Sequence, residues 1–399
     1  MGVKMKFLFS SKARKERQRL KDRTDLLKYV LQDKNIPGNI SGAVSGPLLD
    51  VFTYTSCTGI VPSQIFDLAI ANNGSAKVMR ETGEVQICLP RDYRTMVWFP
   101  DLLKSRAFKK NTLNLPVVLG VNEIGNPVVA DLSKLGNILI CGNRGTGKTY
   151  LVFSLILSVS QHFAPDDITF VMLDTMGEYF LFNDLPHTAK RILSTNPTGE
   201  LIALLNIVKT RPTQDELPHA PIVLIVDKIS DLKPQAQEIL IDILMDGPAK
   251  GVYCIATGDI SYRLLEKLQA CFDTNIVFNM PRKALRRILQ ADSNGLSLCS
   301  YGDAVVRTKA EPPIRIHTPY ASDDTISKIV GWHVQTNVAQ TDLHKTVYDY
   351  IIVNNPSITD IQRKFGISYI HATLLRERAN IIALGDKNDR CIRENKKSV

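Results

Sequence analysis

GNILICGNRGTGKTY, residues 136–150, is the stretch that decides the fold. It opens with a short apolar strand at 138–141, turns through three glycines and continues as an apolar helix at 151–159. A strand, a glycine-rich loop and a helix in this order are the setting of a P-loop, whose backbone amides close around phosphate oxygens. The octet at its centre has the form GxxxxGKT, which predicts binding of ATP or GTP.

The same octet supplies the candidate nucleotide-binding residues. We expect Lys148 to bring a positive charge to the β and γ phosphates and the Thr149 hydroxyl to ligate Mg²⁺. The predicted cofactor-binding set is Gly142, Asn143, Arg144, Gly145, Thr146, Gly147, Lys148 and Thr149.

A second acidic element lies in PIVLIVDKISDL, residues 221–232. Its apolar strand at 222–226 ends in Asp227, a Walker B position from which a carboxylate holds the magnesium shell. Motors of this kind place a glutamate next, to polarise the attacking water, but the residue here is Lys228, which cannot act as a general base while protonated. Lys228 is open to pairing with Asp227 or Asp231, so a base for hydrolysis has to come from elsewhere.

Two carboxylates are candidates for that base. Asp174 and Glu178 follow another apolar strand, within FVMLDTMGEY at 170–179. Both residue types are equally common as capping or surface residues, so the pattern leaves a structural role open for each.

Composition limits the class of protein. The 399 residues suffice for two or three domains, and an apolar fraction of 44% is typical of a globular protein. No apolar run approaches the ~18 residues that a membrane span needs, so no transmembrane segment is predicted. The seven cysteines include no CxxC pair, which argues against a zinc site or a disulfide framework and for reduced thiols. The expected compartment is cytoplasmic.

The net charge of +9 is concentrated at the two ends of the chain. Residues 1–23 hold nine Lys or Arg against two acidic residues, and residues 387–399 hold five against two. The rest of the chain is therefore close to neutral. Such arms either grip nucleic-acid phosphates or are solvated tails, and both interpretations stay open.

The pattern of strands, helices and turns divides the chain into segments. Strands alternating with helices in the largest segment favour a parallel sheet covered on both faces, which makes the fold class α/β. Its expected strands are residues 117–119, 138–141, 168–173, 222–226, 252–256 and 275–278. The predicted segments are a basic arm (1–23), a small α/β subdomain (24–110), the P-loop domain (112–332), a linker (333–341), a helix-turn-helix with a wing (342–391) and a basic tail (392–399).

The ordered set of motifs resembles the FtsK/SpoIIIE family of double-stranded DNA translocases over nearly the whole chain after residue 40. The stretches that carry the resemblance are LPVVLGVNEIGNPVVADLSKLGNILICGNRGTGKT (115–149), NDLPHTAKRILSTNP (183–197), FNMPRKALRRILQADSNGLSLCSYGDAVV (278–306) and EPPIRIHTPYASDDTISKIV (311–330). Residues 45–72 are similar to the small α subdomain of the family, and residues 342–391 to its winged-helix γ subdomain.

The resemblance implies a RecA-like motor that assembles as a hexameric ring on duplex DNA and couples ATP hydrolysis to translocation in DNA segregation or transfer. Lys148 and Asp227 match the catalytic P-loop and Walker B residues of the family, with Thr149 and Asp227 as the magnesium ligands. Thr257 matches the threonine that senses the γ phosphate. Arg286 falls on the arginine that resembles a trans-acting finger, and Arg287, one position away, remains an alternative.

The chain also departs from the family pattern. Besides Lys228, Gly258 stands where the family has glutamine. In the winged helix, Ile370 and His371 replace the Asn and Arg that would read bases. These departures support an alternative function, an ATP-binding but hydrolytically impaired DNA-binding or assembly protein of the same fold.

Overall fold

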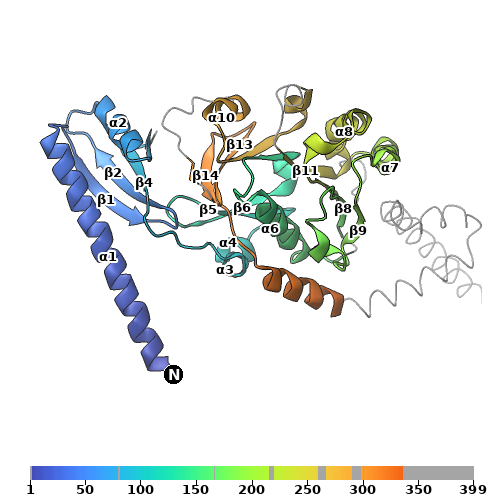
Figure 1. The fold of residues 1–399 in the computed structure, drawn as a ribbon, viewed down its shortest axis with the longest axis horizontal. Coiled ribbons are helices and arrows are strands. Elements are labelled where there is room, and N and C mark those ends of the chain that lie inside the picture. Colours follow the sequence, from blue (N-terminus) through green and yellow to red (C-terminus); the bar gives the residue numbers. More distant parts are fainter. Residues whose placement is uncertain are drawn as a thin grey trace, which may run out of the picture.

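The chain forms two β-sheets that lie side by side (Figure 1). The computed structural model describes residues 2–79, 81–165, 167–214, 220–258, 267–289, 298–299 and 301–335. The predicted winged helix, the basic tail and most of the predicted linker lie outside these residues.

The smaller sheet is antiparallel, with strand order β1-β2-β4-β3. Two helices, α1 and α2, share one apolar core with it, in which Leu31 of α1 and Ile65 of α2 meet Phe52 and Ile87 of the strands. The elements of this part are α1 (Gly2–Asp33), β1 (Asn39–Ser45), β2 (Leu49–Thr55), α2 (Ser63–Ala71), β3 (Ser75–Val78) and β4 (Val85–Pro90).

A buried aspartate fixes α1 to this sheet. Asp50 of β2 is fully buried and accepts hydrogen bonds from Arg19 at 2.8 Å and from Arg23 at 2.5 Å. Arg91 and Arg19 both pair with Glu16 of α1. Two of the arginines of the predicted basic arm are thus used inside the fold, and the predicted boundary at residue 23 falls within α1.

The larger sheet has ten strands in the order β6-β5-β14-β13-β12-β7-β11-β10-β8-β9. Its strands are β5 (Pro116–Val121), β6 (Pro127–Asp131), β7 (Ile138–Cys141), β8 (Thr169–Leu173), β9 (Thr188–Ile192), β10 (Ile222–Val226), β11 (Val252–Gly258), β12 (Thr274–Phe278), β13 (Asp303–Thr308) and β14 (Ile314–His317). The helices are α3 (Phe99–Leu103), α4 (Arg106–Lys109), α5 (Leu132–Leu135), α6 (Lys148–Ser160), α7 (Thr198–Thr210), α8 (Pro234–Asp246) and α10 (Arg282–Leu289), with 3₁₀ turns η1 (Phe180–Phe182), η2 (Ile229–Asp231), η3 (Pro248–Lys250) and η4 (Gln269–Cys271), and residues 323–335 are helical.

The parallel sheet that the sequence predicts is present in one part of the large sheet, and the rest of the sheet is antiparallel. The strands from β12 to β9 are parallel, whereas β13, β14, β5 and β6 pair antiparallel. For β5–β6 and β13–β14, the antiparallel pairing follows from the length of the connections. Only a few residues join β5 to β6 and β13 to β14, and a short turn can return the chain only antiparallel.

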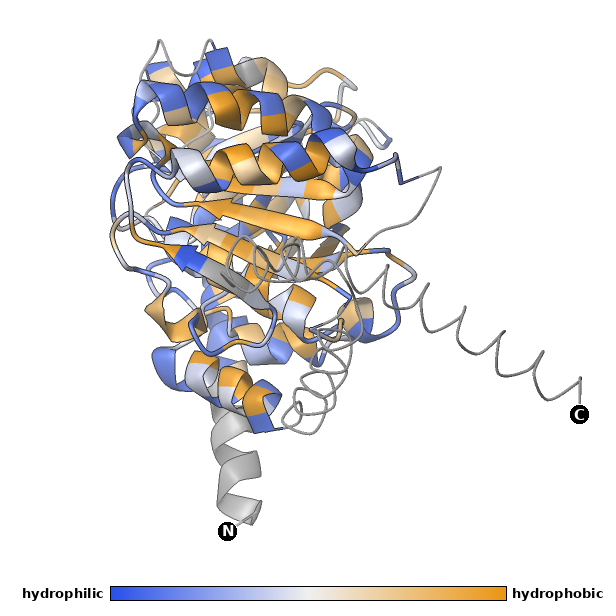
Figure 2. Cartoon of the chain, turned by 90° about the vertical axis from the view of Figure 1, so that its right-hand side faces the viewer, coloured by the Kyte–Doolittle hydropathy of each residue, from blue (hydrophilic) through white to orange (hydrophobic). Residues whose placement is uncertain are grey.

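The parallel strands are buried on both faces, so alternate residues of one strand enter two separate cores. In β7, Ile138 and Ile140 enter the core that contains α3, α4 and α6, whereas Leu139 and Cys141 enter the core that contains α7, α8 and α10. Figure 2 shows these strands as an apolar layer between helices. Within the described residues, no helix is both long enough and apolar enough to cross a bilayer.

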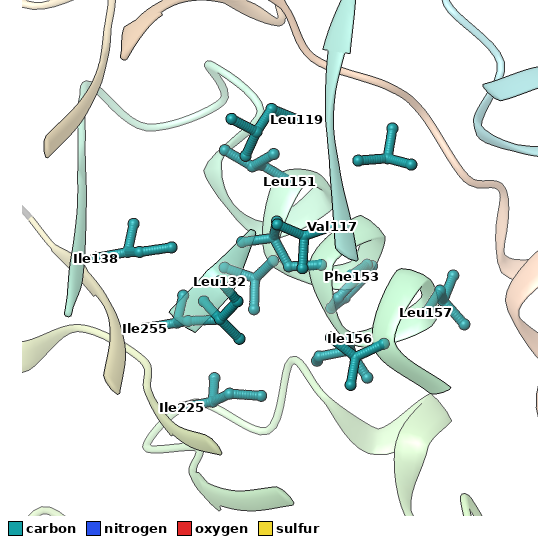
Figure 3. Packing of buried hydrophobic residues seen from close by; sticks show 14 of the residues in the cluster. Val117, Leu119, Leu132, Ile138, Leu151, Phe153, Ile156, Leu157, Ile225 and Ile255 are labelled. Carbon is teal, nitrogen blue, oxygen red and sulfur yellow. The ribbon is translucent and has the colours of Figure 1, made fainter. Parts of the chain in front are cut away.

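Helix α6, which follows the P-loop, is buried from residue 151 to residue 160. Figure 3 shows Leu151, Ile156 and Leu157 packed among strand residues such as Ile225 and Ile255. A helix that is apolar on all sides belongs in the interior. The start of α6, and with it the loop, is therefore held in a fixed position against the sheet.

A buried ion pair lies where the two sheets meet. Arg315 of β14 donates to both carboxylate oxygens of Asp303 in β13, at 2.9 and 2.6 Å, and both side chains are buried. The same guanidinium also donates to Ser75 of β3, at 3.3 Å. Arg315 thus connects the small sheet to the large one.

Two turns meet beside this pair. A Cβ at Gly46, in the β1–β2 turn, would lie 1.8 Å from the carbonyl oxygen of Glu123, in the β5–β6 turn. Lys77 of β3 pairs with the Glu123 carboxylate at 3.0 Å, with the lysine half exposed. The backbones of the two sheets therefore approach too closely here for any side chain at position 46.

Candidate nucleotide-binding site

The glycine-rich loop has the conformation that its sequence predicts. Gly142, Gly145 and Gly147 all have positive φ, at 153°, 77° and 112°. A Cβ at Gly142 would lie 2.6 Å from the Cβ of Phe278 in β12, so this glycine is required by space as well as by conformation. The loop leads directly from β7 into α6, whose N-terminal amides point at the place where phosphate binds.

The loop is held by contacts from outside it. The Asn143 amide donates to the carbonyl of Asn279 at 3.0 Å, and the Gly302 amide donates to the carbonyl of Thr146 at 2.8 Å. The Lys148 ammonium lies over the loop and donates to the carbonyls of Gly142, at 2.6 Å, and Asn143, at 2.9 Å. The loop motif did not reveal Asn279 or Gly302, since both belong to segments far away in the sequence.

Asp227 and Thr257 form the centre of the acidic element. They lie at the ends of β10 and β11, and β11 separates β10 from the P-loop strand β7. The Thr257 hydroxyl donates to Asp227 Oδ1 at 2.8 Å, and among the described residues Asp227 Oδ2 has no hydrogen-bond partner although it is buried. Burial raises the pKa of Asp227, against the hydrogen bond from Thr257. Such a carboxylate oxygen fits a cation.

The backbone of Lys228 has a constrained conformation. Its φ is 50°, in the left-handed region, and its amide donates to the Thr257 hydroxyl at 3.0 Å. The salt bridges of the described part of the chain include none between Lys228 and either Asp227 or Asp231. A Cβ at Gly258 would lie 3.3 Å from the side chain of Ile229, so the glycine leaves little room for a larger residue there.

The two carboxylates in the loop after β8, those of Asp174 and Glu178, have different surroundings. Asp174 is fully buried and accepts the amides of Glu178, at 2.8 Å, and Tyr179, at 2.9 Å. Arg191 of β9 pairs with it at 3.0 Å. Glu178, by contrast, is exposed and its carboxylate accepts a hydrogen bond from the Thr149 hydroxyl at 3.1 Å. Asp174 therefore shapes the loop, and Glu178 reaches the P-loop.

Tyr179 is a buried residue next to these carboxylates. Its side chain is fully buried beneath the site. Burial raises the pKa of Tyr179 well above its ordinary value, and the charges of Asp227, Asp174 and Glu178 raise it further. Asp174 and Glu178 follow β8 and Asp227 follows its parallel neighbour β10, so the three carboxylates lie at the same edge of the sheet.

The residues present fit a nucleotide with a divalent cation. The loop offers glycine amides and the Lys148 ammonium to phosphates, while Thr149 and Asp227 offer oxygen atoms. Arg286 and Arg287 are exposed on α10, whose Leu285 and Ile288 face the core.

Comparison with known proteins finds a matching family model, similar sequences and a similar fold. Residues 100–217 match the model of the FtsK/SpoIIIE family. The DNA translocase FtsK of Helicobacter pylori (strain ATCC 700392 / 26695) is 26% identical over 346 residues, which cover 77% of this chain and 40% of that protein. The DNA translocase FtsK of Rickettsia prowazekii (strain Madrid E) is 24% identical over 455 residues, which cover 92% of this chain and 61% of that protein. The chain thus spans less than two thirds of these relatives.

A solved structure has the same fold. The cytoplasmic domain of the type VII secretion ATPase EccC from Thermomonospora curvata superposes with a TM-score of 0.51 at 18% identity, covering 60% of this chain and 34% of that one. The ordered P-loop, the Asp227–Thr257 pair and the sequence matches agree with one another. The chain is similar to proteins of the FtsK/SpoIIIE family.

Proposed function

We propose that this protein is an ATP-driven translocase of double-stranded DNA, in which Glu178 replaces the glutamate that usually follows the Walker B aspartate. The observation that supports the proposal is the hydrogen bond from the Thr149 hydroxyl to the Glu178 carboxylate. This contact brings a carboxylate to the P-loop, whereas Lys228 stands at the position where the glutamate is usual. The names of the relatives support DNA as the substrate, and duplex DNA implies a cytoplasmic site of action.

Each residue of the site has its own role in ATP hydrolysis. The P-loop amides and Lys148 hold the phosphates of ATP and neutralise their charge. Thr149 and Asp227 would ligate Mg²⁺, which supplies charge neutralisation between the β and γ phosphates. Glu178 orients the attacking water and accepts its proton. Thr257, hydrogen bonded to Asp227, would sense the γ phosphate.

We further propose that the site is completed by a second protomer in a hexameric ring. Arg286, or Arg287 beside it, would stabilise the charge of the transferred phosphoryl group in the neighbour's site, as an arginine finger does. Their exposure on α10 supports this role. The ring would enclose the DNA, so that hydrolysis in successive protomers moves it. The hydrolytically impaired alternative loses its main support, because a carboxylate is present at the P-loop.

Steady-state ATP hydrolysis with and without long duplex DNA tests the proposal. We expect duplex DNA to stimulate turnover of the wild-type protein, and Lys148→Ala to remove it. Lys134→Ala, at an exposed lysine of α5, is the matched control and should behave as wild type. Displacement of a DNA triplex would then report translocation. Turnover that matches the Lys148→Ala blank, or that DNA leaves unchanged, would overturn the proposal.

A further inference from the structure

Three aromatic side chains from distant parts of the chain gather beside the start of α6. The Tyr150 and Tyr320 rings have centroids 4.8 Å apart, and the Trp98 ring meets Tyr320 edge-on at 5.8 Å. Trp98 is 46% exposed and Tyr150 is 36% exposed. We call Trp98, Tyr150 and Tyr320 the aromatic cluster.

The aromatic cluster is partly exposed, and its rings are not needed to anchor α6 in the core. The neighbours of Tyr150 in α6, from Leu151 onward, are all buried, so the helix is anchored without this ring. Burying aromatic surface is favourable, and three large rings left in contact with solvent offer a ready surface for a flat apolar ligand.

The cluster is rigidly connected to the P-loop on two sides. Tyr150 directly follows Thr149 in the first turn of α6. Tyr320 stands two residues after Thr318, whose amide donates to the Gly302 carbonyl at 2.7 Å, and the Gly302 amide donates in turn to the loop. The phosphate site and the rings are therefore parts of one framework.

The third ring is fixed by backbone pairing. Trp98 and Tyr320 form a β-bridge, in which the Tyr320 amide donates to the Val97 carbonyl at 2.8 Å and the Phe99 amide donates to the Tyr320 carbonyl at 3.0 Å. The backbone that carries the Trp98 and Tyr320 rings is thus paired without a ligand, which reduces the ordering that binding requires.

We propose that the aromatic cluster binds the base of the nucleotide whose phosphates lie in the P-loop, with a purine as the preferred ligand because it offers the larger stacking surface. This inference rests on the proposed nucleotide binding at the P-loop and adds the part of the ligand that the loop does not contact. Stacking on aromatic rings is tolerant of base identity, so the cluster favours nucleotides over bare phosphates more strongly than one purine over another.

Calorimetric binding of Mg·ATP and of Mg·tripolyphosphate, which has the phosphates but no base, tests the inference. For Tyr150→Leu and Tyr320→Leu, we expect ATP binding to weaken by about 5- to 150-fold, the range that loss of one stacking contact gives. Tripolyphosphate binding should stay at the wild-type value. Tyr29→Leu, at an exposed tyrosine of α1, is the matched control and should change neither.

The outcomes separate the two proposals. Lys148→Ala should weaken both ligands, since it acts on the phosphates. If the wild-type protein binds neither ligand, the proposed function fails and this inference falls with it. If the tyrosine variants bind ATP as the wild type does, or lose ATP and tripolyphosphate equally, the nucleotide site stands and the base-binding role is refuted.

Tryptophan fluorescence is a second test of whether the nucleotide base contacts the aromatic cluster. The chain has two tryptophans, so Trp332→Phe leaves Trp98 as the sole reporter. In that background we expect ATP to change the Trp98 emission and tripolyphosphate to leave it unchanged. A Trp98 emission that ATP leaves unchanged, or that ATP and tripolyphosphate change equally, would overturn the inference.

Discussion

The loops after β8 and β10 both begin with an aspartate, but the two aspartates have different roles. Each follows a buried apolar strand, and each starts with an aspartate, Asp174 or Asp227. Asp174 has two backbone amides and Arg191 as partners, whereas Asp227 keeps one carboxylate oxygen without a partner among the described residues. Hydrogen-bond partners therefore separate a structural aspartate from a candidate metal ligand, where the strand pattern alone does not.

The largest effect expected is on Glu178. Glu178→Gln should lower the rate of ATP hydrolysis by about 10²- to 10⁴-fold, the usual contribution of a general base, and leave ATP affinity nearly unchanged. Steady-state kinetics with a binding titration measure both. Glu238→Gln, at an exposed glutamate of α8, is the matched control. An unchanged rate would mean that the base lies elsewhere.

Asp174→Asn should act on stability more than on chemistry. The change removes the charge that pairs with Arg191, and breaking a buried pair costs about 3 kcal/mol in the free energy of unfolding. Denaturant unfolding measures this, with Asp246→Asn at an exposed aspartate as the control. Folded Asp174→Asn protein should retain more turnover than Glu178→Gln. The reverse ranking, with stability intact, would exchange the roles of the two residues.

Lys228→Glu should not raise turnover. The added carboxylate duplicates the role of Glu178 and replaces a positive charge that lowers the pKa of Asp227, a group whose pKa burial raises. We expect a loss of less than about tenfold, the effect of one pKa unit on protonation. Lys228→Gln, which removes the charge without adding a base, is the comparison for steady-state rates. A clear gain in rate would show that position 228 still determines hydrolysis.

Thr257→Val should change the pH dependence of ATP hydrolysis. Burial raises the pKa of Asp227, and the Thr257 hydrogen bond opposes this, so its loss raises the pKa further. Because ionised Asp227 is the form that binds a cation, the acid limb of the rate profile should move to higher pH. Thr257→Ser keeps the hydroxyl and should keep the wild-type limb. Coincident limbs in Thr257→Val and wild type would exclude this coupling.

The sequence predicted the central strands well because their apolar runs are buried on both faces. The strands expected at 138–141 and 222–226 match β7 and β10 residue for residue. It missed β6, at the edge of the sheet, whose Pro127 is exposed and whose next three residues are only partly buried. It also missed β9, β13 and β14. These strands are set by pairing with their neighbours, and no local pattern records that pairing.

The candidate site was predicted in part. The P-loop geometry follows from the glycines, but Glu178 and Asp174 were equivalent in the sequence. Their separation depends on Arg191, which comes from a strand that the sequence did not predict. Similarly, the aromatic cluster joins segments more than fifty residues apart in the chain, and no periodicity connects them.

The contact between the two sheets has a practical consequence for experiments at different ionic strengths. Dissolved salt screens exposed charges over a Debye length of about 8 Å at 0.15 M and has much less effect on buried ones. The Asp303–Arg315 pair is shielded from solvent, and the close approach of Gly46 to Glu123 carries no charge at all, whereas the Lys77–Glu123 pair is half exposed. Raising the ionic strength should therefore leave the small sheet attached, so that a loss of DNA binding in high salt can be assigned to the DNA contacts.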